Sequence, residues 1–113
     1  MLFKTIPKRW LIHTVVSAAV TTAVGAFGGD TVTEGQTIGN VRIIGLKRDV
    51  TVTKDDIEYS VNAVLLHQPG ISTDFTYTEG EHLLFRGKLY RIMAVEEMFE
   101  AERLHHLEVQ LCG

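Results

Sequence analysis

The sequence predicts an all-β fold: a small antiparallel β-barrel or sandwich with long loops and at most one short helix. β-Branched segments of strand length recur along the chain, and turn residues separate them. Ten glycines stand against two prolines, which favours many tight turns. No long stretch shows the 3.6-residue apolar period of a helix. With 113 residues, the chain is expected to form one domain, residues 1–113.

The expected strands follow from apolar, β-branched runs and from period-two alternation. They span residues 10–16, 37–44, 59–67, 82–85, 89–95 and 105–112. Arg86-Gly87-Lys88 is expected to reverse the chain between two of them as a hairpin. In the last strand, alternation predicts that His105 and His106 point to opposite faces and do not ligate one ion together.

Three segments are expected to connect these strands. Residues 17–35 are interpreted as a small-residue loop region. Within it, residues 17–29 are rich in small side chains and could form a strand, a short helix or a flexible loop, and residues 30–35 are expected to form a loop. Residues 47–58 are the most polar stretch; Val50-Thr51-Val52 has strand character, but the segment is interpreted as a long exposed excursion. Residues 96–103 carry four glutamates and are expected to form a polar connection or a turn of helix.

The N-terminal segment has two readings. Basic residues precede an apolar stretch from Trp10 to Phe27, and Ala23-Val24-Gly25-Ala26 resembles a signal cleavage site. This pattern supports a secreted small β-barrel binding module with residues 1 to about 26 as a signal peptide. The polar residues that interrupt the stretch favour the other reading, a strand over residues 9–16 that runs into a small-residue loop.

Charge and motifs exclude several function classes. The net charge is −3, so broad neutralisation of phosphates is not expected to drive binding. Lys4, Lys8, Arg9 and Trp10 form a basic and aromatic cluster that is too small to act alone. The single cysteine, Cys112, permits neither an internal disulfide nor a cysteine-rich zinc site. No Gly-x-Ser-x-Gly or Walker-type phosphate loop occurs. We therefore expect no enzyme activity, catalytic residue, metal or cofactor.

Several ordered motifs carry a family resemblance. They are residues 8–15 (KRWLIHTV), 37–43 (TIGNVRI), 61–66 (VNAVLL), 79–81 (EGE) with 86–92 (RGKLYRI), and 104–111 (LHHLEVQL). In this order they resemble a tailed-phage family described as minor capsid proteins, which are related to the head-closure, or stopper, proteins of the siphophage neck. The resemblance is best in the last third of the chain.

The resemblance implies a structural neck protein of the virion, assembled in the host cytoplasm and without membrane contact. Such a protein forms a ring below the portal and adaptor rings, closes the DNA-filled head and offers a docking surface for the tail. Its expected partners are other copies of itself, the adaptor and portal proteins, a tail terminator or tail-completion protein, and double-stranded DNA contacted without sequence specificity. The free chain is expected to be monomeric or weakly associating.

In related stoppers an extended loop closes the channel, and the polar excursion is the candidate for that loop. Its charged residues are Lys47, Arg48, Asp49, Lys54, Asp55, Asp56 and Glu58. Phe75, Tyr77, Met93, Met98 and Phe99 are candidates for core or subunit interface, and a core position is expected for the aromatic residues.

Overall fold

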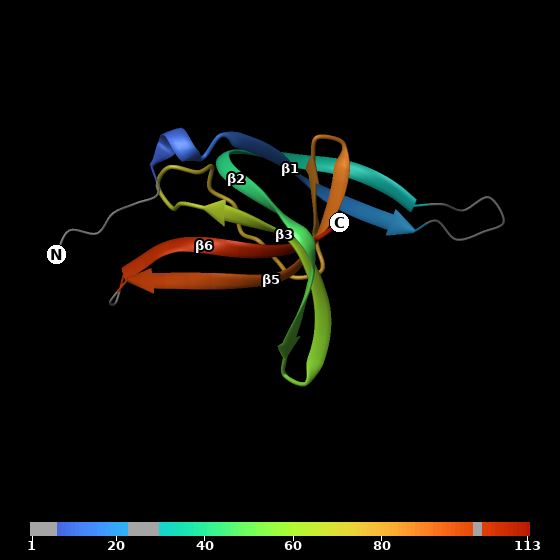
Figure 1. The fold of residues 1–113 in the computed structure, drawn as a ribbon. Helices are drawn as coiled ribbons and strands as arrows, with labels where there is room; N and C mark the ends of the chain where they lie inside the picture. The colour runs from blue at the N-terminus through green and yellow to red at the C-terminus, as the bar shows by residue number, and fades with distance from the viewer. Residues whose placement is uncertain (1–6, 23–29, 101–102) are drawn as a thin grey trace.

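Six antiparallel strands close into a barrel in the part of the chain that the computed structural model describes, residues 7–22, 30–100 and 103–113 (Figure 1). The elements are a turn of 3-10 helix, η1 (Lys8–Trp10), and the strands β1 (His13–Thr22), β2 (Asp30–Lys54), β3 (Ile57–His67), β4 (His82–Phe85), β5 (Lys88–Glu100) and β6 (Arg103–Cys112). Around the barrel the order is β1-β2-β3-β6-β5-β4. The expected all-β class is confirmed, and the architecture is the barrel.

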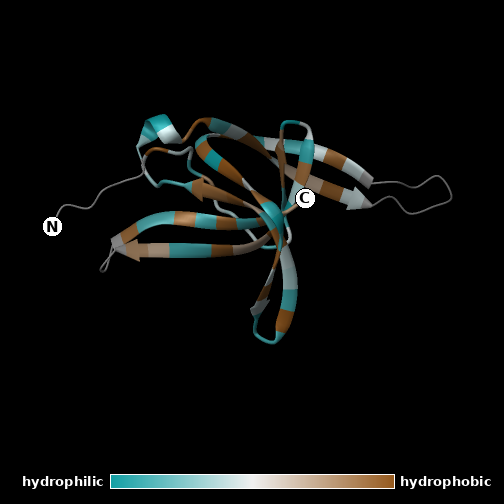
Figure 2. Cartoon of the chain, viewed as in Figure 1, coloured by the Kyte–Doolittle hydropathy of each residue, from teal (hydrophilic) through white to brown (hydrophobic). Residues whose placement is uncertain are grey.

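Hydrophobic and hydrophilic residues alternate along the strands (Figure 2), and the buried hydrophobic side chains fill the barrel interior. Leu65 of β3 is fully buried and stands between two other core residues, since it pairs with Ile43 on one side and Val109 on the other. The buried cluster consists of Val15, Ile38, Val41, Ile43, Ala63, Leu65, Tyr77, Leu83, Ile92, Val109 and Leu111. Every strand therefore contributes to one core.

The N-terminal segment is part of this barrel. β1 pairs with both β2 and β4, and its residue Val15 has no exposed surface. Removal of the segment as a signal peptide would take away a barrel strand, so the structure does not support the secreted-module alternative. Residues 1–6 and 23–29, which that reading also includes, lie outside the described residues.

The prediction of a small-residue loop over residues 17–35 is wrong for the residues at both ends of that segment. Residues 17–22 belong to β1 and residues 30–35 to β2, and the two runs pair with one another, as Val20 does with Val32. Threonine and valine suit a strand even where the pleat is open to solvent on both faces, so the usual apolar alternation is missing. Residues 23–29 of that prediction lie outside the described residues.

The connection from β3 to β4 crosses one end of the barrel, because these two strands are not neighbours. Tyr77 on this connection is buried in the core, which confirms the position expected for it, and Phe75 is half-buried and packs against the core. Two hydrogen bonds fasten the connection to β2: the Gly39 amide donates to the Thr73 hydroxyl (3.0 Å), and the Thr73 amide donates to the Gly39 carbonyl (3.2 Å). The connection from β3 to β4 therefore covers this end of the barrel.

Within the described residues, three strand pairs extend beyond the barrel as two-stranded ribbons (Figure 1). We call them the β1–β2 arm (Ala19–Thr22 and Asp30–Thr33), the β2–β3 arm (Val50–Lys54 and Ile57–Val61) and the β5–β6 arm (Glu96–Glu100 and Arg103–His106). In these ranges each strand pairs only with its hairpin partner. The arms give the molecule its elongated shape, with extents of 61 × 33 × 26 Å.

Truncation of the central core side chain tests this arrangement. Leu65→Ala is expected to lower the free energy of unfolding by about 2–5 kcal/mol, because the surrounding strands are held in the closed barrel and collapse only partly into the cavity. Urea unfolding followed by circular dichroism measures the change. Ile57→Ala is the control: Ile57 is 67% exposed on the β2–β3 arm, so its truncation should cost less than about 0.5 kcal/mol. Equal losses in both variants would contradict the assigned core.

Candidate functional site

The predicted polar excursion over residues 47–58 is a β-hairpin and not an irregular loop. Val52 pairs with Tyr59 and Lys54 pairs with Ile57, so the ladder continues to the tip of the β2–β3 arm. Asp55 and Asp56 form the turn with φ angles of +53° and +63°. Positive φ at both central residues is the geometry that suits the right-handed twist of two-residue hairpins. The prediction of an exposed, projecting segment stays valid, but its backbone is ordered by its own ladder.

The structure sorts the seven candidate channel residues into two groups on this arm. At the base, Gly45 pairs with Ala63 and Val50 with Val61, so residues 46–49 of β2 stand opposite the single residue 62 of β3. Lys47, Arg48 and Asp49 lie in this wide bulge, where the arm leaves the barrel. Lys54, Asp55, Asp56 and Glu58 lie at the tip. All seven residues are exposed, and none forms an ion pair with another described residue.

Side-chain hydrogen bonds fix the arm to the barrel. The Tyr59 hydroxyl on the arm donates to the Gln110 side-chain oxygen on β6 (2.9 Å). At the base, the Asn62 side chain donates to the Gly113 carbonyl (2.9 Å) and accepts from the Gly113 amide (3.0 Å). An open hollow of about 300 Å³ lies beside the arm, lined by Lys54, Asp55, Ile57, Tyr59, Glu79 and Met93. The direction of the arm is therefore set by polar contacts, with little apolar packing.

The β5–β6 arm replaces the polar connection expected over residues 96–103. β5 continues to Glu100 and β6 begins at Arg103, while residues 101–102 lie outside the described residues. The core position expected for Phe99 is wrong, since this side chain is 57% exposed, and the neighbouring Met98 is 38% exposed. Met93 is half-buried on the same strand. Beyond the barrel the ribbon has no opposite sheet to cover it, so its apolar side chains remain in solvent.

A β-bulge at the base of this arm brings two histidines together, against the prediction that His105 and His106 point to opposite faces. Met98 pairs with His106 but Phe99 pairs with Leu104, so His105 is the extra residue of β6. A bulge re-aims the side chain that it carries. The Nδ1 atoms of His105 and His106 consequently lie 2.7 Å apart, and their rings meet edge to face.

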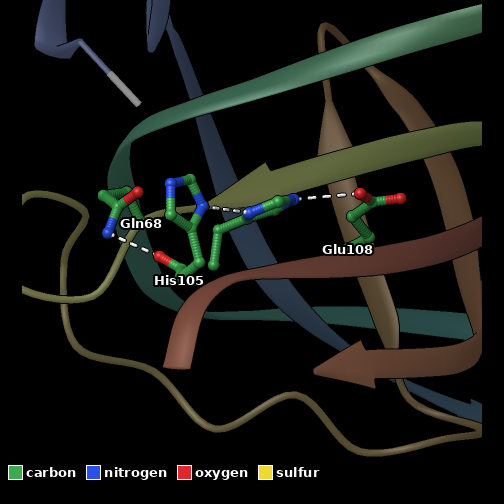
Figure 3. A network of polar contacts seen from close by, with 4 residues as sticks. Gln68, His105 and Glu108 are labelled. Carbon is green, nitrogen blue, oxygen red and sulfur yellow. Dashed lines mark hydrogen bonds and ion pairs between the residues drawn. The ribbon is translucent and has the colours of Figure 1, made fainter. Parts of the chain in front are cut away.

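Polar contacts continue on both sides of this histidine pair (Figure 3). The Gln68 side-chain amide donates to the His105 carbonyl (2.7 Å), and His106 Nε2 lies 2.9 Å from a Glu108 carboxylate oxygen. This row connects the end of β3 to the base of the β5–β6 arm and aligns the two. Within the described ranges no cluster of three or more His, Cys, Asp or Glu side chains is placed to hold a metal ion.

A second polar pair lies inside the barrel. His67 is buried, and its Nδ1 atom lies 2.8 Å from the Tyr77 hydroxyl. Burial lowers the pKa of His67 below its ordinary value of 6.5, with the Asp74 carboxylate acting in the opposite direction. Burial also raises the pKa of the Tyr77 phenol, which therefore stays neutral. A neutral phenol donates well to an unprotonated Nδ1, so the pair favours uncharged histidine.

An apolar hollow with a basic rim lies on the outer face of the β2–β3 sheet. It has a volume of about 410 Å³ and is lined by Trp10, Arg42, Ile44 and Leu66. The Arg42 guanidinium donates to the Trp10 carbonyl (3.3 Å), which ties η1 to β2. The sequence signal for this hollow was the cluster of Lys8, Arg9 and Trp10, but the partner residues come from distant segments. We call it the Trp10 hollow.

His67 and His13 together predict acid sensitivity. His13 Nδ1 accepts a hydrogen bond from the Ile43 amide (2.9 Å), and burial, then Arg86 and Arg42, lower its pKa. Just below pH 6.5 the unfolded chain therefore binds more protons than the folded chain. The stability that follows from keeping these two histidines neutral is fully present above about pH 6.5. It is lost as the pH falls towards the lowered pKa values of the two histidines in the folded protein. Urea unfolding at about pH 7.5 and pH 5.5 should show the loss.

The matched variant for this pH dependence is His67→Gln, which keeps a polar partner for Tyr77 but does not titrate. Its loss of stability between the two pH values should be smaller than that of the unchanged protein. Equal losses would show that His67 does not contribute.

None of the helical segments in the described residues is long and apolar enough to span a bilayer. A search of curated proteins and a search of solved structures each found no match. The family model described as "Minor capsid protein" matches residues 7–111, which includes all three arms and all of the barrel except Cys112, the last residue of β6. With nearly its full length matched, the chain belongs to this minor capsid protein family.

Proposed function

We propose that this minor capsid protein forms a ring in the neck of a tailed phage. Its family makes it a structural component of the virion. In the proposal the ring lies below the portal and adaptor rings, closes the DNA-filled head and provides the docking surface for the tail. The observation that carries the proposal is the β2–β3 arm, a charged ribbon that leaves the barrel and is hydrogen-bonded to it through Tyr59 and, at its base, through Asn62.

The arm extends well beyond the barrel, as a channel-closing element would. Five residues of β2, Val50–Lys54, pair with Ile57–Val61 beyond the basal bulge. At about 3.4 Å per residue, the arm extends roughly 17 Å from the barrel. In a ring, one arm from each copy would converge on the central axis, so a narrow element repeated by symmetry would obstruct a wide channel.

The charges of the arm are suited to closing the channel without binding the DNA tightly. Its candidate channel residues are three cations and four carboxylates, and the whole chain carries a net charge of −3. A strongly basic surface would bind the DNA backbone through counterion release and would slow its exit. An arm with no excess of positive charge, carrying one cation and three carboxylates at its tip, instead blocks the channel by volume. The proposal accordingly assigns no sequence recognition and no catalytic step to the protein.

The remaining surface supports assembly with other subunits. Large apolar side chains are exposed on all three arms and beside η1 in the described residues: Trp10, Ile12, Val32, Ile44, Val50, Ile57, Met98 and Phe99. Such side chains gain stability when a neighbour covers them. The proposed neighbours are further copies of the chain within the ring, the adaptor or portal proteins above it, and a tail terminator or tail-completion protein below. Assembly would take place in the host cytoplasm.

Loss of the gene tests the closure role directly. Lysates of a parent phage without this gene are expected to contain heads that packaged DNA and lost it, beside free tails, because nothing closes the portal or joins the tail. Electron microscopy of the lysates shows both species. Normal infectious virions from the same phage would overturn the proposal.

Shortening the arm tests the assignment of the closing element. Val52 and Tyr59 pair directly, so replacing residues 53–58 by Asn-Gly keeps the register and the Tyr59–Gln110 hydrogen bond but removes the tip. Assembled particles should then lose their DNA although the barrel folds. The control is Asp55→Asn, which keeps the arm length and tolerates the positive φ of the turn. Full DNA retention and tail joining with the short arm would refute the assignment.

A further inference from the structure

The Trp10 hollow combines exposed apolar surface with positive charge. Trp10 is 53% exposed and Ile44 is 41% exposed, although both lie beside the well-packed barrel. Arg42 and Leu66 pair across β2 and β3, so both side chains share the outer face of the sheet with Ile44. Lys8 and Arg9 adjoin the hollow in sequence, and residues 7–16 contain no acidic residue. The hollow therefore favours an apolar ligand with negative neighbours.

The β5–β6 arm has the opposite character. Residues 96–108 contain five glutamates and one arginine. Phe99 on this arm is 57% exposed and pairs across the ribbon with Leu104, so two apolar side chains lie together on one face. Glu96 and Glu97, both exposed, precede them on the same strand. The arm thus presents an apolar tip in an acidic setting.

We propose that the β5–β6 arm of one copy docks into the Trp10 hollow of a second copy. Phe99 would lie against Trp10 and Ile44, with Glu96 and Glu97 of the arm near Lys8, Arg9 and Arg42. This inference rests on the proposed ring and names the contact that builds it. Opposite charges around an apolar centre fit the two surfaces to one another and disfavour contact between like surfaces.

The chemistry of the contact agrees with that of protein interfaces. Aromatic residues, methionine and arginine are enriched in interface cores, and tryptophan and arginine carry much of the binding energy. The hollow supplies Trp10 and Arg42, and the arm supplies Phe99 with its cross-strand neighbour Leu104. Because the two surfaces are different parts of the chain, the contact is heterologous and propagates from copy to copy. A heterologous contact produces a ring when its rotation closes.

Disulfide trapping between two purified full-length chains tests this contact. Both chains carry Cys112→Ser, which removes the native thiol. One also carries Trp10→Cys and the other Phe99→Cys, and heterodimer formation under mild oxidation is followed on non-reducing gels. The matched control replaces Phe99→Cys by Ile57→Cys, since Ile57 is at least as exposed but lies on the β2–β3 arm. The Trp10–Phe99 pair should cross-link about tenfold faster, because docking raises the effective concentration of the two thiols. Asp55, Asp56 and Glu58 give Ile57 a similarly acidic setting, so this comparison separates docking from simple charge attraction.

Charge reversal adds an independent measurement. Glu96→Lys with Glu97→Lys on the arm chain should reduce the cross-linking rate to that of the control pair. Lys8→Glu with Arg9→Glu on the other chain should then restore it. Where Trp10→Cys disturbs η1, Ile44→Cys on the sheet takes its place.

Equal rates for the Phe99 and Ile57 pairs would overturn the proposed contact. If the two rates are equal and phage without the gene still lose their DNA, the proposed neck ring is retained and the hollow is assigned to another partner. Fast trapping beside normal virions without the gene would support the contact and refute the neck role. The disulfide-trapping experiment and the gene-loss experiment can therefore refute the contact and the neck role separately.

Discussion

Closure of a narrow barrel is the constraint on which the rest of the structure depends. β4 has only four residues, and β1 contacts it through three residue pairs, Val16–Ala18 with His82–Leu84. β3 and β6 share five pairs. These short ladders limit the height of the barrel, whereas β2 alone has 25 residues. Strand length beyond the closed ladder has no neighbour except its hairpin partner, so it leaves the barrel as an arm. Closure of the barrel therefore determines both which side chains form the core and which strand segments project as arms.

The arms carry the features that the core cannot. Inside the barrel, side chains such as Leu65 and Val109 are chosen by packing, and the polar exceptions His67 and Tyr77 satisfy each other. On the arms, beyond basal residues such as the buried Val61, exposed side chains lie on both faces, so charged and apolar residues occur without a packing penalty. Polar anchors, the Tyr59–Gln110 hydrogen bond and the Gln68–His105–His106–Glu108 row, set the directions of two arms. The barrel is therefore a scaffold that holds the arms, whose exposed surfaces are available for contacts with other molecules.

Much of the barrel could be predicted from the sequence, because its strands face a core on one side. The alternation in residues 105–112 and the hairpin at Arg86-Gly87-Lys88 marked β6 and the β4–β5 turn, and β4 was placed at its observed limits. The arms were mistaken for loops because a ribbon exposed on both faces shows no period-two burial signal. The histidine contact depends on a bulge, and a bulge leaves no local pattern. The Trp10 hollow joins residues of η1, β2 and β3 that are more than 20 positions apart in sequence, so no single segment shows it.

The position of Trp10 has an optical consequence. It is the only tryptophan of the chain, and it lies half in solvent at the edge of the barrel and not in the core. Its indole emission therefore reports on one hollow and scarcely on the interior. Loss of the core changes the surroundings of this ring little, so emission is a weak monitor of unfolding. An event that covers the hollow removes water from the ring and shifts its emission to shorter wavelength, which provides an unlabelled and local signal for whatever settles on that face.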